Sequence, residues 1–173
     1  MRPFVFTALL FSLAVHAAAL LVDRIAAVVD GHPITRSLVT LRAQARMKSA
    51  ATKADQAKVL TETLETLIEE RLIQEDARRL RLVIASEDID RALAEIGKQT
   101  QLSPEALQAE LKRQGLTLTE YRASIGQMVL ELKWLNLKLN RTSALETDRA
   151  RDLAERARLL TALRAEFAVE VRQ

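Results

Sequence analysis

The scarcity of helix-breaking residues constrains this chain more than any other feature. Its 173 residues include only four glycines and three prolines, while Ala, Leu, Glu, Gln, Lys and Arg fill most positions. Those six residue types are strong helix formers, whereas helices tolerate glycine and proline least. We therefore predict a mainly α fold with few and short loops.

The N-terminal segment, residues 1–19, has the arrangement of a secretory signal peptide. Arg2 precedes an apolar run that ends at Val15, and Ala17 and Ala19 follow as small residues. A basic start, an apolar middle and an A-x-A exit are typical of export signals. The run is shorter than the ~20 residues that a spanning helix needs. We therefore predict cleavage near Ala19, with an uncleaved membrane anchor as the alternative.

Residues 20–173 would form the mature protein, a length typical of one domain with one core. The sequence has no cysteine, so we expect packing alone to hold this domain, without disulfides or thiolate metal sites. Loss of Arg2 leaves 25 Lys and Arg residues against 23 Asp and Glu residues. This small excess does not suit counterion-driven binding of nucleic acid, so we predict no nucleic-acid partner.

Two segments at opposite ends of the mature chain depart from the helical pattern. Residues 22–29 (VDRIAAVV) are apolar and β-branched, and residues 30–33 (DGHP) then form a predicted turn. Residues 167–171 (FAVEV) alternate with the period of a strand. A lone strand leaves its backbone groups unpaired, so we predict that the two segments pair with each other.

The sequence between these segments carries the start signals of six helices. Ser, Thr and Asp are preferred N-cap residues, and the pattern T-x-x-E or S-x-x-E is a capping box. Pro104 and Gly115 mark the first turn and the end of the fourth helix. We predict helices that begin at Thr35 or Ser37, at Asp55, near Ser86, at Ser103, at Thr117 and at Ser143. The first runs to about Ser49 and the last ends near Glu166.

The fifth predicted helix is apolar on two faces. One face carries Tyr121, Ile125, Met128, Leu132, Leu135 and Leu139. The opposite face carries Leu130, Trp134 and Leu137. Such a helix either lies between two layers of the core or presents one side to a partner. Both interpretations stay open, with a possible partner surface or dimer surface centred on Trp134.

The mature chain carries no recognisable catalytic constellation. Adjacent carboxylates such as Glu75 and Asp76 diverge by ~100° on a helix and do not meet one substrate. His32 is the only histidine after residue 19, and we interpret it as a solvated turn residue. No second histidine is present there to activate a serine. We predict no catalytic residues, no metal site and no cofactor.

Several stretches resemble one protein family. VDRIAAVVDGHPITRSLV (22–39), LETLIEERLIQEDARRLRLVIASEDIDRAL (64–93) and GLTLTEYRASI (115–125) resemble the N-terminal region of the SurA family of periplasmic chaperones. LLTALRAEFAVEV (159–171) is similar to the C-terminal helix and strand that complete the same domain. The resemblance implies a SurA N-terminal and trigger-factor-like peptide-binding helical domain. It also implies a periplasmic location and binding of unfolded outer-membrane proteins.

Two departures from this family stand out. SurA-like proteins carry parvulin-type prolyl isomerase domains between the long helix and the C-terminal helix, but here Asn140 and Ser143 are nearly adjacent. We therefore expect a single domain, residues 20–140 closed by residues 143–173, without an isomerase domain. Arg81 stands where relatives often have a helix-ending glycine, which raises the question of how the chain turns there.

From these observations we predict an ATP-independent holdase that binds unfolded outer-membrane or exported polypeptides in an apolar groove. Large or flexible apolar side chains adapt to many partners. The candidate contact residues are Trp134, Leu130, Leu137 and Met47, and core packing is the alternative role of each. An envelope structural or adaptor protein, as a stable oligomer or on one defined partner, is the second hypothesis. A prolyl isomerase is the third and is least favoured.

Overall fold

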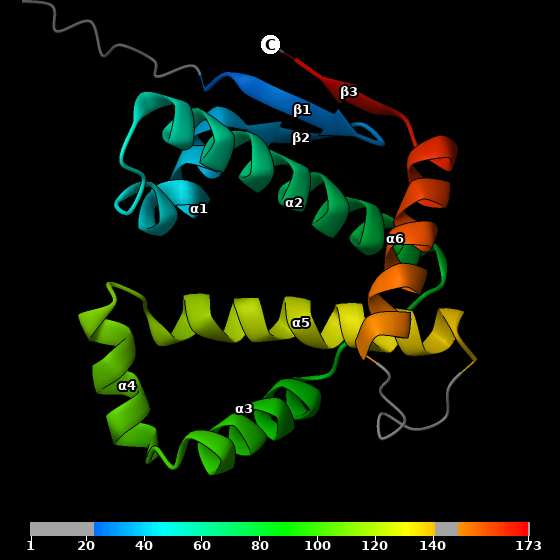
Figure 1. The fold of residues 1–173 in the computed structure, drawn as a ribbon. Coiled ribbons are helices and arrows are strands. Elements are labelled where there is room, and N and C mark those ends of the chain that lie inside the picture. Colours follow the sequence, from blue (N-terminus) through cyan, green and yellow to red (C-terminus); the bar gives the residue numbers. More distant parts are fainter. Residues whose placement is uncertain (1–22, 141–148, 173) are drawn as a thin grey trace, which may run out of the picture.

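Six helices and a small three-stranded sheet make up the protein in a computed structural model that describes residues 23–140 and 149–172 (Figure 1). In chain order the elements are β1 (Ile25–Val29), β2 (His32–Thr35), α1 (Arg36–Met47), α2 (Lys53–Arg79), α3 (Ser86–Thr100), α4 (Pro104–Arg113), α5 (Leu118–Lys138), α6 (Arg149–Glu166) and β3 (Val169–Val171). The predicted mainly α fold with six helices is confirmed. The predicted signal peptide and the predicted sixth cap at Ser143 lie outside the described residues.

The sheet joins the two ends of the described chain. Its strand order is β2-β1-β3 with antiparallel pairing throughout, and Ala27 lies opposite Val171. The predicted pairing of the end segments is therefore confirmed. The predicted four-residue turn at 30–33 is wrong, because His32 and Pro33 already belong to β2. Asp30 and Gly31 both have positive φ, and such a two-residue loop returns the chain at once as a hairpin.

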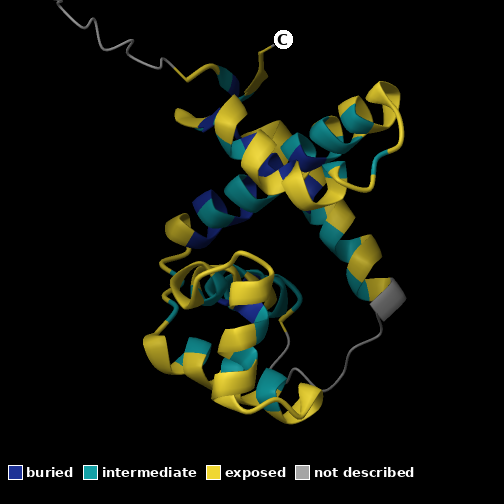
Figure 2. Ribbon diagram, turned by 90° about the vertical axis from the view of Figure 1, so that its left-hand side faces the viewer, coloured by how far each residue is buried: buried dark blue, intermediate teal, exposed yellow. Residues whose placement is uncertain are grey.

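The sheet, helices α1, α2 and α6 and the Trp134 region of α5 form the hydrophobic core. Its largest fully buried side chains are Val29, Ile34, Ile68, Leu72, Ile73 and Trp134. Helix α2 runs along the sheet, and its buried face is the common contact surface for α1, α5 and α6. Figure 2 shows the buried residues concentrated in this part of the molecule.

A second, thinner part of the molecule projects beyond α5. Helices α3 and α4 lie on the side of α5 that is turned away from the sheet (Figure 1). We call residues 86–126, which comprise α3, α4 and the first part of α5, the arm. All of the arm is described, and Leu111 and Ile125 are its only buried hydrophobic side chains. The arm therefore has little core of its own.

Side-chain caps set most of the helix starts. Thr35, Ser103 and Thr117 accept backbone N–H groups as predicted N-caps. The predicted cap at Asp55 is wrong. Thr52 is the N-cap of α2, and Asp55 occupies its third position, where the carboxylate bonds back to the Thr52 backbone N–H at 3.0 Å. This reciprocal pair is a capping box, in which both residues are needed.

Arg81 keeps the glycine-like turn that follows α2. Its φ is +54°, in the left-handed region. The Leu82 N–H donates to the Ala77 carbonyl at 2.9 Å, and the Arg81 N–H donates to the Arg78 carbonyl at 3.1 Å. These bonds satisfy the carbonyls at the end of α2. The backbone thus adopts the geometry that glycine favours although an arginine occupies the position.

Substituting Arg81→Gly should stabilise the protein. A residue with a Cβ disfavours the left-handed conformation by about 1–2 kcal/mol, and the greater chain entropy of glycine offsets part of this gain. We expect the free energy of unfolding in urea to rise by up to about 1 kcal/mol. Arg81→Ala is the matched control, because alanine keeps the Cβ and should not stabilise. Equal stability of the two variants would contradict the interpretation.

Candidate functional site

Trp134 anchors α5 in the core. Its side chain is fully buried, and the indole Nε1–H donates to Asp76 Oδ2 at 2.6 Å. The Lys138 ammonium lies 2.6 Å from the same oxygen. The buried carboxylate of Asp76 therefore has two partners from α5. In this structure Trp134 itself belongs to the core, whereas Leu137 of the same face is 49% exposed.

The four predicted contact residues differ in how far they are exposed. Trp134 exposes nothing to a partner, and Leu130 is half-buried against the core. Met47 is half-buried at the end of α1, and Leu137 is 49% exposed. None of the four lines the hollow described below. Contact of Leu130, Leu137 or Met47 with a partner stays a prediction.

Truncation of Trp134 should destabilise the fold. Trp134→Ala removes a fully buried indole and leaves Asp76 without its neutral donor, so we expect a loss of about 3–5 kcal/mol in the free energy of unfolding. Trp134→Phe, which keeps most of the volume, should lose about 1–3 kcal/mol. Urea unfolding followed by circular dichroism measures both. A loss below about 1 kcal/mol for Trp134→Ala would contradict the core assignment.

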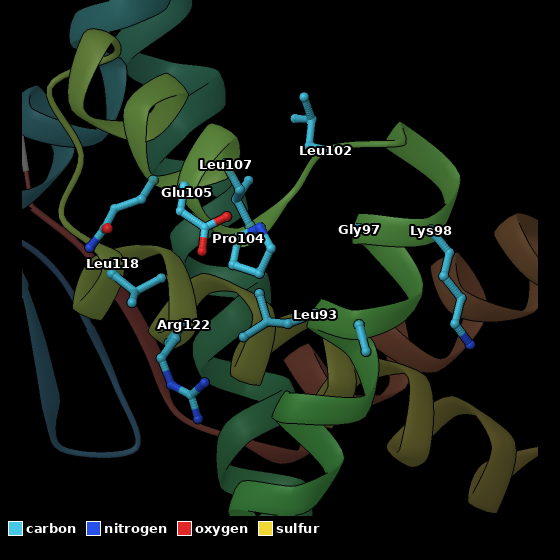
Figure 3. A pocket seen from close by; sticks show the side chains of 11 residues that line it. Leu93, Gly97, Lys98, Leu102, Pro104, Glu105, Leu107, Leu118 and Arg122 are labelled. Atoms are coloured by element: carbon cyan, nitrogen blue, oxygen red, sulfur yellow. The ribbon is translucent and has the colours of Figure 1, made fainter.

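The arm encloses an apolar hollow of about 610 Å³. Figure 3 shows Leu93 of α3, Pro104 of α4 and Leu118 of α5 arranged around it. The lining residues are Leu93, Ala94, Gly97, Lys98, Leu102, Pro104, Glu105, Leu107, Gln108, Leu118 and Arg122. We call this space the arm hollow. Pockets of about 300–1,000 Å³ with an apolar lining and few polar groups are typical of ligand sites.

Local sequence explains the shape of the arm hollow. Gly97 has no side chain, so the wall of α3 is open at this point, and an added Cβ would lie 3.6 Å from the Leu102 carbonyl oxygen. Ser103 caps α4 and Pro104 occupies its first turn, which fixes where α4 leaves the loop. Leu111, near the C-terminal end of α4, is the buried residue of this helix. The hollow is therefore bounded by three helices whose starts and ends are well determined.

Close packing and ion pairs hold α3 against α5. Gly126 admits Ile89, whose Cδ1 lies only 3.3 Å from the position that a Cβ at residue 126 would occupy. Lys133 contacts Asp88 at 2.5 Å, and Arg122 contacts Asp90 at 2.6 Å. The Lys133 hydrogen bond is the main reason that the pKa of the Asp88 carboxyl is below its usual value. These contacts position the Leu93 face of α3 opposite Leu118.

The rim of the arm hollow is charged while its interior is apolar. Lys98, Glu105 and Arg122 are the charged lining residues. Hydrogen bonds from the Glu105 backbone N–H and the Ser103 hydroxyl hold the pKa of the Glu105 carboxyl below its usual value. Glu105 is therefore ionised at neutral pH. Both signs of charge are present at the rim, so it does not select ligands of one charge.

Leucines at the mouth of the arm hollow remain accessible to solvent. Leu102 is 37% exposed, and Leu118 is 42% exposed. Each Å² of apolar surface removed from water contributes about 25 cal/mol. Clustered exposed apolar side chains mark interaction surfaces. The arm hollow therefore presents apolar surface to solvent.

Comparison with known proteins assigns the family. The family model described as the SurA N-terminal domain matches residues 22–133. The chain belongs to this family. The match includes β1, β2, α1 to α4 and most of α5, so the whole arm lies within the SurA N-terminal domain.

Individual relatives agree with this assignment. Chaperone SurA of Cupriavidus pinatubonensis is 33% identical over 113 residues, which cover 63% of this chain and 23% of that protein. Chaperone SurA of Sodalis glossinidius is 29% identical over 156 residues, 87% of this chain and 36% of that protein. A solved structure reported under the SurA-like chaperones PEB4 and Cj1289 of Campylobacter jejuni has a TM-score of 0.46 and 23% identity, and the alignment covers 66% of this chain and 41% of that one. The chain thus spans about a quarter to a third of the length of the curated SurA proteins.

The arm hollow was not among the sequence predictions for this SurA N-terminal domain. The apolar stripe of Ile89, Leu93 and Ile96 is readable from its spacing, but a stripe of this kind usually packs into a core. Leu102 lies in the loop before α4 and belongs to no stripe, and Leu118 is the first residue of α5, on the face of Tyr121 and Ile125. One sequence feature could have indicated the hollow. Helix α4 is short and has one buried residue, Leu111, so it covers little of α3.

The described residues also bear on two other predictions. His32, interpreted from the sequence as a turn residue, lies in β2, and its Nδ1 is 3.2 Å from the buried Glu75 carboxylate. Residues 23–140 and 149–172 contain no group of three His, Cys, Asp or Glu side chains placed to hold a metal ion. No helix within these ranges is long and apolar enough to span a bilayer.

Proposed function

We propose that this protein is an ATP-independent holdase of the periplasm that binds unfolded outer-membrane or exported polypeptides in the arm hollow. The observation that carries the proposal is an accessible apolar hollow built by three helices of a SurA N-terminal domain. The curated relatives are named Chaperone SurA. The proposal includes no catalytic step and no cofactor.

The lining of the arm hollow suits weak and reversible capture. Its large apolar side chains are mainly leucines, which accept aliphatic or aromatic client side chains without a fixed geometry. Ordering a flexible client costs entropy, so only the binding free energy that exceeds this cost appears as affinity. Capture of this kind needs no nucleotide cycle, because release follows when the client buries the same side chains in its own fold.

The proposed client surface lies in the arm hollow and not around Trp134, where the sequence predicted it. Trp134 holds the arm in place through Asp76 but does not contact the client. Leu93, Leu107 and Leu118 take over the role that the sequence assigned to the Trp134 face. Variants of Trp134 therefore act on function only through stability.

Filling the arm hollow at Gly97 tests the proposal. Gly97→Leu places a side chain in the hollow, whereas Gly97→Ala adds only a methyl group with an ordinary contact to the Leu102 carbonyl. Alanine also favours helix by about 1 kcal/mol. We expect Gly97→Ala to suppress aggregation of a urea-diluted outer-membrane β-barrel protein as well as the wild type. Gly97→Leu should need several-fold more protein for the same effect.

Light scattering measures the suppression, and thermal unfolding shows whether each variant is folded. A folded Gly97→Leu variant that suppresses aggregation as well as the wild type would contradict binding in the arm hollow. Absence of suppression by the wild type itself would contradict the holdase proposal as a whole.

One observation favours a second function, that of an envelope adaptor or stable oligomer. Met128 and Leu132 of α5 are 61% and 49% exposed, and neither lines the arm hollow. An apolar pair at this spacing on a helix is typical of a contact with one partner helix. Sedimentation velocity distinguishes the two functions, because an adaptor of this kind would be a concentration-independent dimer that Met128→Gln dissociates.

A further inference from the structure

A second hollow lies at the other end of the molecule, where α1 and α2 meet the sheet. Its volume is about 240 Å³. The lining residues are Ala26, Arg36, Val39, Thr40, Leu60, Thr61, Leu64 and Arg172. We call it the sheet hollow. None of its residues lines the arm hollow, so its properties are independent of the function proposed above.

The floor of the sheet hollow is apolar. Ala26 and Val39 are buried, and Leu60 and Leu64 pack partly buried against the core. The two threonine hydroxyls are already used, since Thr40 donates to the Arg36 carbonyl at 2.9 Å and Thr61 donates to the Ala57 carbonyl at 3.1 Å. The side-chain donors left to a ligand are therefore the two guanidinium groups.

The sheet fixes both arginine backbones on either side of β1. The Arg36 N–H donates to the Arg24 carbonyl at 2.7 Å, on the side of β2. The Arg172 N–H donates to the Ala26 carbonyl at 2.8 Å, on the side of β3. Both arginines line the sheet hollow, and their backbones are held at opposite edges of one strand. The two side chains therefore start from fixed positions beside one space.

Neither arginine is well neutralised by the protein. Arg36 is the first residue of α1, a helix without an acidic residue in its first turn. The Asp23 carboxylate at this helix start accepts the Ser37 backbone N–H at 3.3 Å and the Ser37 hydroxyl, and no ion pair with Arg36 is found among the described residues. A cation at a helix N-terminus is unfavourable. Arg172 contacts Glu170 at 3.4 Å, but both side chains are more than half exposed, and such pairs contribute little.

These features together specify the ligand. Guanidinium groups bind a carboxylate through paired hydrogen bonds. A volume of about 240 Å³ is below the range of drug-sized ligand sites, so the apolar floor accommodates one side chain and not a long acyl chain. We propose that the sheet hollow binds the C-terminal residue of a polypeptide, with its α-carboxylate between Arg36 and Arg172 and an apolar side chain on the floor.

The strand order adds support for a peptide. Among the described strands β3 is at the edge of the sheet, and Arg172 follows it directly. An edge strand presents unpaired N–H and C=O groups that an extended chain can use. The residues that precede the bound C-terminus therefore have a place to lie, which a free fatty acid would not use.

A labelled peptide with a C-terminal leucine tests the proposal by fluorescence anisotropy with the purified protein. We expect binding of the free acid and at least about tenfold weaker binding of the same peptide with a C-terminal amide, because the amide loses a charge-assisted bond. Replacing the terminal leucine with serine should also weaken binding several-fold. Arg36→Gln and Arg172→Gln should each weaken binding of the acid several-fold and leave binding of the amide unchanged.

Arg24→Gln is the matched control, since it removes one exposed positive charge beside the sheet hollow from a residue that does not line it. It should bind the acid as the wild type does. Equal binding of acid and amide would overturn the proposal, as would an equal loss with Arg24→Gln or no binding at all. Octanoate that displaces the peptide at the peptide's own affinity would overturn the assignment to a polypeptide. Thermal unfolding confirms that each variant is folded.

Discussion

The shape of this protein depends on the hydrogen bond and the ion pair that α5 makes with the buried Asp76 carboxylate. Asp76 lies on α2, the helix along the sheet, and receives both the Trp134 indole N–H and the Lys138 ammonium from α5. A buried carboxylate needs such partners, because desolvation without them costs several kcal/mol. Gln74 of α2 adds a further bond to Gln127 of α5 at 2.7 Å. Helix α5 is thereby fixed across α2.

The position of α5 determines where the arm can be. The C-terminal part of α5 belongs to the core through Trp134, while its N-terminal part carries α3 and α4 beyond that core (Figure 1). An arm with only two buried hydrophobic side chains would not fold alone. The arm is stabilised by packing against α5. Leu93, Leu102 and Leu118 are not used in a core and line the hollow. The C-terminal part of α5 thus contributes to the core, and its N-terminal part lines the hollow of the proposed binding site.

Sequence periodicity predicted most of the helices and strands but not the site. The six helices and the pairing of the two end segments follow from local spacing and from the need to satisfy strand backbones. β2 was missed because Pro33 resembles a turn residue, although proline is tolerated at the start of an edge strand. The two-faced pattern of α5 was correct, but spacing does not reveal which face meets α2. The arm hollow arises from three helices and from Gly97, and only their placement in space brings them together.

The most direct test of the account is site-specific crosslinking from the arm hollow. A photo-reactive phenylalanine analogue at Leu102, at the mouth of the arm hollow, is compared with the same residue at Leu153, an exposed leucine of α6 that is 63% accessible. Each protein is irradiated with an unfolded outer-membrane β-barrel protein. The account predicts a strong crosslink from position 102 and little from position 153. Equal yields from the two positions, or a stronger yield from position 153, would contradict client binding in the arm hollow.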